Sequence, residues 1–161
     1  MSDSKLVQEW LKYSQNDIIS ANHLFDDLYP KQTEIACYLS QQCAEKALRG
    51  YLLFKDTEPP KTHNLVELCQ ICMSHENTFS EILNACADLT PYGVAVRYPN
   101  ELAVDDIIAK SAIDKAQVIY DFRAVKVSGI SNDDFGRSGK QSRFLFSVDT
   151  SKYDKSIYRF L

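Results

Sequence analysis

Glycine and proline are scarce in this chain, with five of each among 161 residues. Long stretches contain neither residue, which favours helices over a turn-rich β fold. No apolar run reaches the ~18 residues that a membrane-spanning helix needs. The first residues also lack the apolar stretch of a signal peptide. We therefore expect a helical protein of the cytoplasm that does not associate with membranes.

Cysteine is present in an odd number, five, and all five residues fall inside helical patterns. An odd count in a reducing compartment argues against a disulfide framework. Cys69 and Cys72 form a lone CxxC pair, but a zinc site needs a second pair of ligands and a redox motif needs a thioredoxin-like βαβ context. We expect the cysteines to pack in the core as small hydrophobic residues, and we predict no metal site and no cofactor.

The net charge of −4 is distributed unevenly along the chain. Residues 1–122 carry 10 Lys and Arg against 18 Asp and Glu, a net charge of −8, whereas residues 123–161 carry 8 against 4, a net charge of +4. The acidic body is a poor electrostatic match for duplex DNA. The basic tail is a candidate for nucleic-acid binding, although a charged tail of this kind is usually just solvated.

Five segments show the apolar spacing of amphipathic helices. They cover approximately residues 7–28, 33–55, 65–72, 79–89 and 104–122. The spacing therefore predicts an all-α domain of about five helices over residues 1–122.

Several local features refine these helices. In the first, Leu6, Trp10 and Tyr13 widen the apolar stripe. In the second, the small residues allow another helix to approach closely; they stand at positions 36, 43, 44, 47 and 50. Asn64 and Glu67 form a variant of the capping box at the start of the third.

The periodic pattern stops after Phe122. Residues 123–140 contain glycine, serine and aspartate, a composition typical of a linker. Residues 141–161 regain aromatic side chains without a helical stripe, and residues 142–148 are a candidate lone strand. We predict that residues 123–161 form a basic, aromatic-containing tail that is irregular or partly disordered.

Three passages carry a resemblance to a known family. They are residues 38–52 (YLSQQCAEKALRGYL), 60–68 (PKTHNLVEL) and 90–99 (TPYGVAVRYP). In this order, with matching helices between them, they resemble the HEPN family of higher eukaryote and prokaryote nucleotide-binding domains over roughly residues 5–122. The resemblance implies an up-and-down helical bundle that commonly forms a homodimer. Many bacterial members pair with a minimal nucleotidyltransferase encoded beside them, and other members are ribonucleases, often toxins.

The ribonuclease members of the family place an arginine and a histidine four to six residues apart, across a dimer cleft. Here Arg97 is followed by Tyr-Pro-Asn-Glu-Leu-Ala-Val, and none of His23, His63 and His75 follows Arg97 or Arg49 at that spacing. Such a ribonuclease uses the histidine for proton transfer and the arginine for phosphate charge. The sequence therefore favours a non-ribonuclease variant, and we predict no catalytic residue.

Arg97 is one of two arginines in residues 1–122, the other being Arg49. It lies between two prolines, with Tyr92 and Tyr98 in the same loop. A guanidinium beside aromatic rings can clamp a phosphate and stack on a base. The alternative is that Arg97 holds the loop down through a salt bridge to Glu45 or Asp105. Both interpretations remain open at this point.

The second helix carries a polar face formed by Gln41, Gln42, Glu45, Lys46 and Arg49, and the last four are three or four residues apart. From spacing alone, a solvated surface with Glu–Lys pairing is the simpler interpretation. The resemblance implies instead that this face borders a cleft or a dimer seam. His63, just before the third helix, either caps that helix or meets a ligand phosphate at its start.

These features together predict a non-catalytic, homodimeric protein that binds a nucleotide or a minimal nucleotidyltransferase. The predicted ligand-binding residues are Arg97, Tyr98, Tyr92, Lys46, Arg49, Glu45, Gln42 and His63. One alternative is a divergent ribonuclease toxin of a toxin–antitoxin pair, in which Arg97 works with another acid–base group. Another alternative is a helical scaffold whose tail docks a partner.

Overall fold

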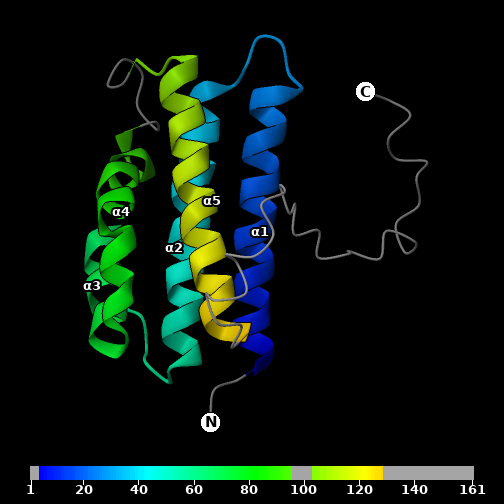
Figure 1. Cartoon of the computed structure of the whole chain (residues 1–161). Helices are drawn as coiled ribbons and strands as arrows, with labels where there is room; N and C mark the ends of the chain where they lie inside the picture. The colour runs from blue at the N-terminus through cyan, green and yellow to red at the C-terminus, as the bar shows by residue number, and fades with distance from the viewer. Residues whose placement is uncertain (1–3, 96–102, 129–161) are drawn as a thin grey trace, which may run out of the picture. The chain divides into compact units, whose positions relative to one another are not determined.

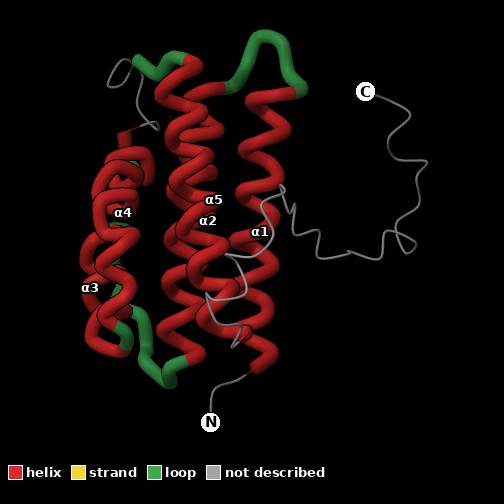
Figure 2. The backbone as a smooth tube through the Cα atoms, viewed as in Figure 1, coloured by secondary structure: helices red, strands yellow, loops and turns green. Residues whose placement is uncertain are grey.

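The computed structural model describes residues 4–95 and 103–128, and every regular element in these ranges is helical (Figure 1, Figure 2). The α-helices are α1 (Ser4–Asp26), α2 (Thr33–Phe54), α3 (Leu65–His75), α4 (Leu83–Leu89) and α5 (Asp106–Ser128). Two short 3-10 turns flank α4, namely η1 (Asn77–Ile82) and η2 (Thr90–Gly93). The predicted all-α bundle is confirmed. The predicted strand at residues 142–148 lies outside the described residues.

Helix α2 lies at the centre of the bundle. It packs along α1 on one side and along α5 on another, and it also contacts α3. Figure 1 shows α2 returning alongside α1, with α5 next to both. The predicted small residues of α2 make this close packing possible, and all are buried: Ala36, Cys43, Ala44, Ala47 and Gly50.

Helix α1 presents a narrower apolar stripe than the sequence predicts. Its buried residues are Val7, Ser14, Ile18, Ala21 and Phe25. Leu6 and Tyr13 are exposed, so the prediction that they widen the stripe was wrong. The hydroxyl of Ser14 donates a hydrogen bond to the carbonyl oxygen of Cys43 (2.7 Å), which explains why a polar residue fits between α1 and α2.

Asn64 caps the N-terminus of α3. Its side-chain oxygen accepts hydrogen bonds from the backbone N–H groups of Val66 (2.9 Å) and Glu67 (3.4 Å). The backbone N–H of Asn64 donates to the hydroxyl of Thr62 (3.2 Å) rather than to Glu67. The predicted capping box is therefore only half formed, and the loop before the helix supplies the second partner.

Helix α5 continues to Ser128, so the prediction that residues 123–128 belong to a linker was wrong. Arg123 is fully buried. The ammonium group of Lys126 pairs with the carboxylate of Glu76. The apolar pattern ends at Phe122 because the next buried position is occupied by the charged side chain of Arg123. From the sequence alone, this break in the pattern looks like the end of the helix. A truncation that removes only the tail must keep residues through 128.

Candidate functional site

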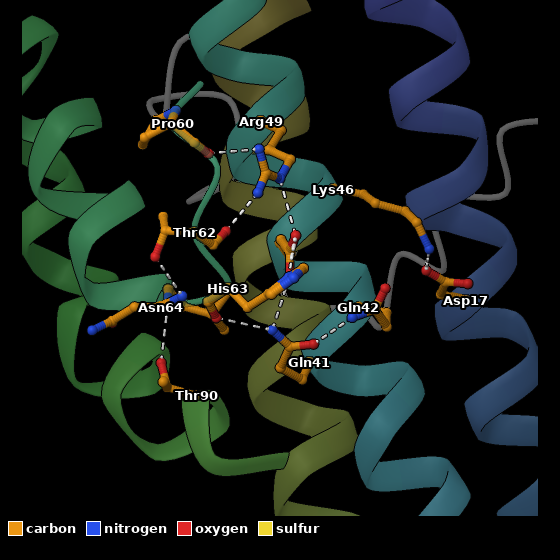
Figure 3. Close-up of polar contacts among 12 residues, drawn as sticks. Asp17, Gln41, Gln42, Lys46, Arg49, Pro60, Thr62, His63, Asn64 and Thr90 are labelled. Carbon is orange, nitrogen blue, oxygen red and sulfur yellow. Dashed lines mark hydrogen bonds and ion pairs between the residues drawn. The ribbon is translucent and has the colours of Figure 1, made fainter. Parts of the chain in front are cut away.

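The polar residues of α2 face the interior of the bundle and not the solvent. Gln41 is 0% exposed and Glu45 is 7% exposed. The amide of Gln41 donates to the carbonyl oxygen of His63 in the loop before α3 (3.3 Å), as Figure 3 shows. Gly93 of the η2 turn also lies close to this amide. The interpretation of this face as a solvated surface was therefore wrong, because periodicity places residues on one face without saying what that face meets.

Glu45 is the shared acceptor of this network. One carboxylate oxygen accepts a hydrogen bond from Nε of Arg49 (3.0 Å), and the other accepts one from the amide nitrogen of Gln41 (3.1 Å). Nδ1 of His63 lies 3.1 Å from both oxygens. A buried carboxylate is tolerated because these donors replace the water that it has lost.

Arg49 ties the loop between α2 and α3 to the bundle. Beyond its bond to Glu45, Nη1 donates to the carbonyl oxygen of Pro60 (3.0 Å) and Nη2 donates to that of Thr62 (2.5 Å), as Figure 3 shows. All three nitrogens of the guanidinium are thus engaged within the chain, and its side chain is only 13% exposed. In this arrangement Arg49 positions the loop that carries His63.

Lys46 is also engaged within the bundle. Its ammonium group pairs with the carboxylate of Asp17 on α1 (Figure 3). Burial raises the pKa of the Asp17 carboxyl, and the ammonium group of Lys46 opposes that rise. Both cations of α2 therefore stabilise the fold, while their predicted cooperation with Arg97 at a phosphate stays a prediction.

His63 does not cap α3, because Asn64 fills that role. Its ring turns back toward α2, where Nδ1 faces Glu45. The side chain is 68% exposed although Nδ1 is held at Glu45. A carboxylate on one ring nitrogen orients an imidazole and selects the tautomer that leaves the other nitrogen free to accept a proton.

The η2 turn brings the chain directly onto this network. The hydroxyl of Thr90 accepts a hydrogen bond from the backbone N–H of Leu65 (3.1 Å) at the start of α3. A Cβ atom at Gly93 would lie 2.9 Å from the amide carbon of Gln41, which explains why glycine is needed there. The predicted Arg97 loop therefore begins against the buried amide of Gln41.

The remaining predicted site residues lie around this turn. The amide of Gln42 donates to the side-chain oxygen of Gln41 (2.7 Å). Tyr92 is half-buried, and burial raises the pKa of its hydroxyl. Arg97 and Tyr98 lie outside the described residues. The structure thus brings Gln42, Glu45, Arg49 and His63 into one network, and Lys46 into a separate ion pair.

Two members of these contacts were not among the predicted ligand-binding residues. Gln41 was placed on the polar face of the second helix, and its spacing of four from Glu45 was an available signal. Asp17 lies on α1, far from Lys46 in the sequence, and nothing in its local pattern indicated the pairing. Only the packing of α1 against α2 reveals it.

Comparison with known proteins identifies the family. The family model of the HEPN domain matches residues 7–127 of this chain. The chain belongs to the HEPN family. A comparison with curated proteins finds no match.

Two solved structures are similar to this HEPN chain. The crystal structure of ST0689, described as an archaeal HEPN homologue, is 26% identical, covers 75% of this chain and 97% of its own, and has a TM-score of 0.61. The crystal structure of TT1696 from Thermus thermophilus is 22% identical, covers 78% of this chain and 99% of its own, and has a TM-score of 0.68. The second similarity concerns the fold alone.

Within residues 4–95 and 103–128, no three His, Cys, Asp or Glu side chains come together as metal ligands do. No helix in the same ranges has the length and apolar character needed to span a membrane. All five cysteines are free thiols in the core, including the CxxC pair, which agrees with a packing role.

Proposed function

We propose that this HEPN protein is a non-catalytic binding protein that takes a nucleotide or a minimal nucleotidyltransferase partner and acts as a homodimer. The observation that carries the proposal is the contact of Gly93 with Gln41. It starts the Arg97 loop on a rigid, buried network, and loops held by a rigid scaffold often carry binding residues.

The charges of the chain favour a small phosphate ligand over a long nucleic acid. Residues 1–122 carry a net charge of −8, which would repel an extended polyanion. Lys46 and Arg49 are paired with Asp17 and Glu45, so they add little free positive charge. Arg97 then supplies the guanidinium that clamps a phosphate, with Tyr92 or Tyr98 available to stack on a base.

Binding of ATP and GTP to the full chain, measured by isothermal titration calorimetry, tests the ligand. We expect Arg97→Ala to weaken binding about tenfold or more, since a lost charge-assisted hydrogen bond is worth roughly 1.5–3 kcal/mol. Lys61→Ala, which removes an exposed cation beside Thr62, is the matched control and should bind as the wild type does. Equal binding by Arg97→Ala, or none by the wild type, would contradict the nucleotide site.

A second candidate function is the divergent ribonuclease toxin, and one specific observation favours it. His63, oriented by Glu45 and 68% exposed, has the arrangement of a general acid–base group. Under this hypothesis the imidazole of His63 transfers the proton during RNA cleavage, and a cation such as Arg97 neutralises the phosphate charge.

Purified full chain incubated with total RNA separates the two candidates. Under the ribonuclease hypothesis the wild type degrades RNA and arrests growth on expression. His63→Ala then loses at least 100-fold in rate, as expected for a general acid–base group. His75→Ala, which alters an exposed histidine, serves as control and should keep the activity. Intact RNA and normal growth with the wild type would eliminate this candidate.

A further inference from the structure

Helix α5 carries apolar residues on two faces. The inner face packs against the bundle and is buried at Ala109, Ala112, Ile113, Ala116 and Ile119. On the outer face, Ile107 is 81% exposed and Val118 is 54% exposed. A helix that is apolar on both sides is normally covered on both sides. Within the part of the chain that the structure describes, the outer face is left uncovered.

The outer face of α5 borders a shallow groove of ≈620 Å³ that is also lined by Ala85 of α4. Its apolar lining residues are Ala85, Ile107 and Val118, and the remaining lining residues are Asp106, Lys110, Ser111, Asp114 and Lys115. Apolar residues surrounded by a charged rim are typical of a protein–protein contact. A small-molecule pocket would enclose its ligand more fully.

Two of the rim charges are already held by other elements. Asp106 pairs with Lys31 in the loop after α1 (2.7 Å), and Lys115 pairs with Asp88 on α4 (2.8 Å). The remaining pair, Lys110 and Asp114, belongs to α5 itself, and its side chains are 52% and 60% exposed. An exposed pair of opposite charges one turn apart can exchange partners with an identical pair on another chain.

A two-fold axis across α5 makes this face complementary to itself. Two antiparallel copies of the helix place residues opposite each other when their numbers add to a constant sum. If Lys110 lies opposite Asp114 of the second copy, symmetry generates the reciprocal pair, and Ile107 falls within one residue of Val118 of the second copy. The contact then extends over about 16 Å of helix. An isologous interface requires this kind of self-complementarity.

We infer that the outer face of α5, together with Ala85, is the surface through which two copies of this chain associate in an antiparallel arrangement. The inference rests on the homodimer in the proposed function and adds the surface that forms it. The partner is a second copy of this chain, because a two-fold axis brings Lys110 and Asp114 of one copy opposite Asp114 and Lys110 of the other.

Charge reversal at the central pair tests the arrangement, with the full chain and molar mass measured by light scattering at low salt. We expect a wild-type dimer. Lys110→Asp and Asp114→Lys should each weaken self-association at least tenfold, because each places two pairs of like charges across the axis. An equimolar mixture of the two variants should dimerise again, because each chain then offers the charge that the other lacks. If the substitutions instead damaged each chain by itself, the mixture would not dimerise.

Apolar substitutions provide the matched control. Val118→Asp should also weaken the dimer, whereas Ile19→Asp on α1, where the side chain is 56% exposed, should leave it unchanged. Circular dichroism confirms that each variant is folded. A wild-type dimer indifferent to the α5 changes, or no rescue in the mixture, would overturn this surface and leave the homodimer standing. A wild-type monomer would overturn both the α5 surface and the proposed homodimer. The proposed nucleotide site would still be tested by the separate binding measurement.

Discussion

Glu45→Ala is expected to lower the free energy of unfolding by about 3–5 kcal/mol, the range observed when one member of a buried ion pair is removed. Glu45 is 7% exposed and accepts hydrogen bonds from Arg49 and Gln41, with His63 at 3.1 Å. Its loss would leave the guanidinium of Arg49 largely buried without a counter-charge. Urea denaturation followed by circular dichroism measures the change.

Two further variants make the Glu45 experiment specific. Glu9→Ala alters an exposed carboxylate on α1 and should change stability by less than about 0.5 kcal/mol. Glu45→Gln keeps an oxygen that can accept from Arg49 but loses the charge, so its stability should fall between those of Glu45→Ala and the wild type. A loss below about 1 kcal/mol for Glu45→Ala would mean that the network is not a unit of stability.

Arg123→Met is expected to have the opposite sign and to raise the free energy of unfolding by about 1–4 kcal/mol. Arg123 is 0% exposed, and none of its three guanidinium nitrogens has a hydrogen-bond partner among the described residues. Burial lowers the pKa of this guanidinium to about 9, so it is still charged at neutral pH. A buried charge without acceptors is destabilising, and methionine fills a similar space without the charge.

The environment of Arg123 shows how closely the guanidinium is enclosed. A Cβ atom at Gly50 would lie 2.8 Å from Nη2 of Arg123 and 3.3 Å from Cβ of Trp10. Glycine at this position of α2 therefore makes room for the arginine of α5.

Arg49→Met is the matched control, because it removes an equally large buried arginine whose nitrogens are all paired. It should destabilise the protein by about 3–5 kcal/mol under the same conditions, since it leaves Glu45 buried without its cation. If Arg123→Met lowered the stability instead, Arg123 would have an acceptor outside the described residues, and the expected gain would be wrong. The two arginines thus test whether hydrogen-bond pairing or burial alone decides if an Arg→Met substitution raises or lowers the free energy of unfolding.

These two predictions bear on the proposed function through the position of the Arg97 loop. The Glu45 network holds the loop before α3 through Arg49, and it holds the η2 turn through the contact of Gln41 with Gly93. Both segments therefore share one buried support. Damage to Glu45 is expected to weaken ATP and GTP binding together with stability, whereas Arg123→Met is expected to leave binding unchanged.

The helices themselves could be predicted from the sequence. Apolar residues at steps of three and four marked all five helices. The buried small residues of α2 were also predictable, because residues without bulk on one face allow close helix packing. Asn64 was recognised as a cap from its type and position alone. These features are local, so spacing and residue type are enough to determine them.

Only the tertiary structure decided where the polar residues of α2 point. Glu45 and Arg49 looked like a solvated surface, and the packing of α3 and η2 made them an interior network with His63. The same holds for Asp17 on α1, which pairs with Lys46 on α2. It also holds for Arg123, whose charge interrupts the apolar pattern before the last turns of α5. The sequence by itself determined the family, the helices and the residues that share a face. Their partners depend on how distant segments pack, and a periodic pattern within one segment contains no information about that.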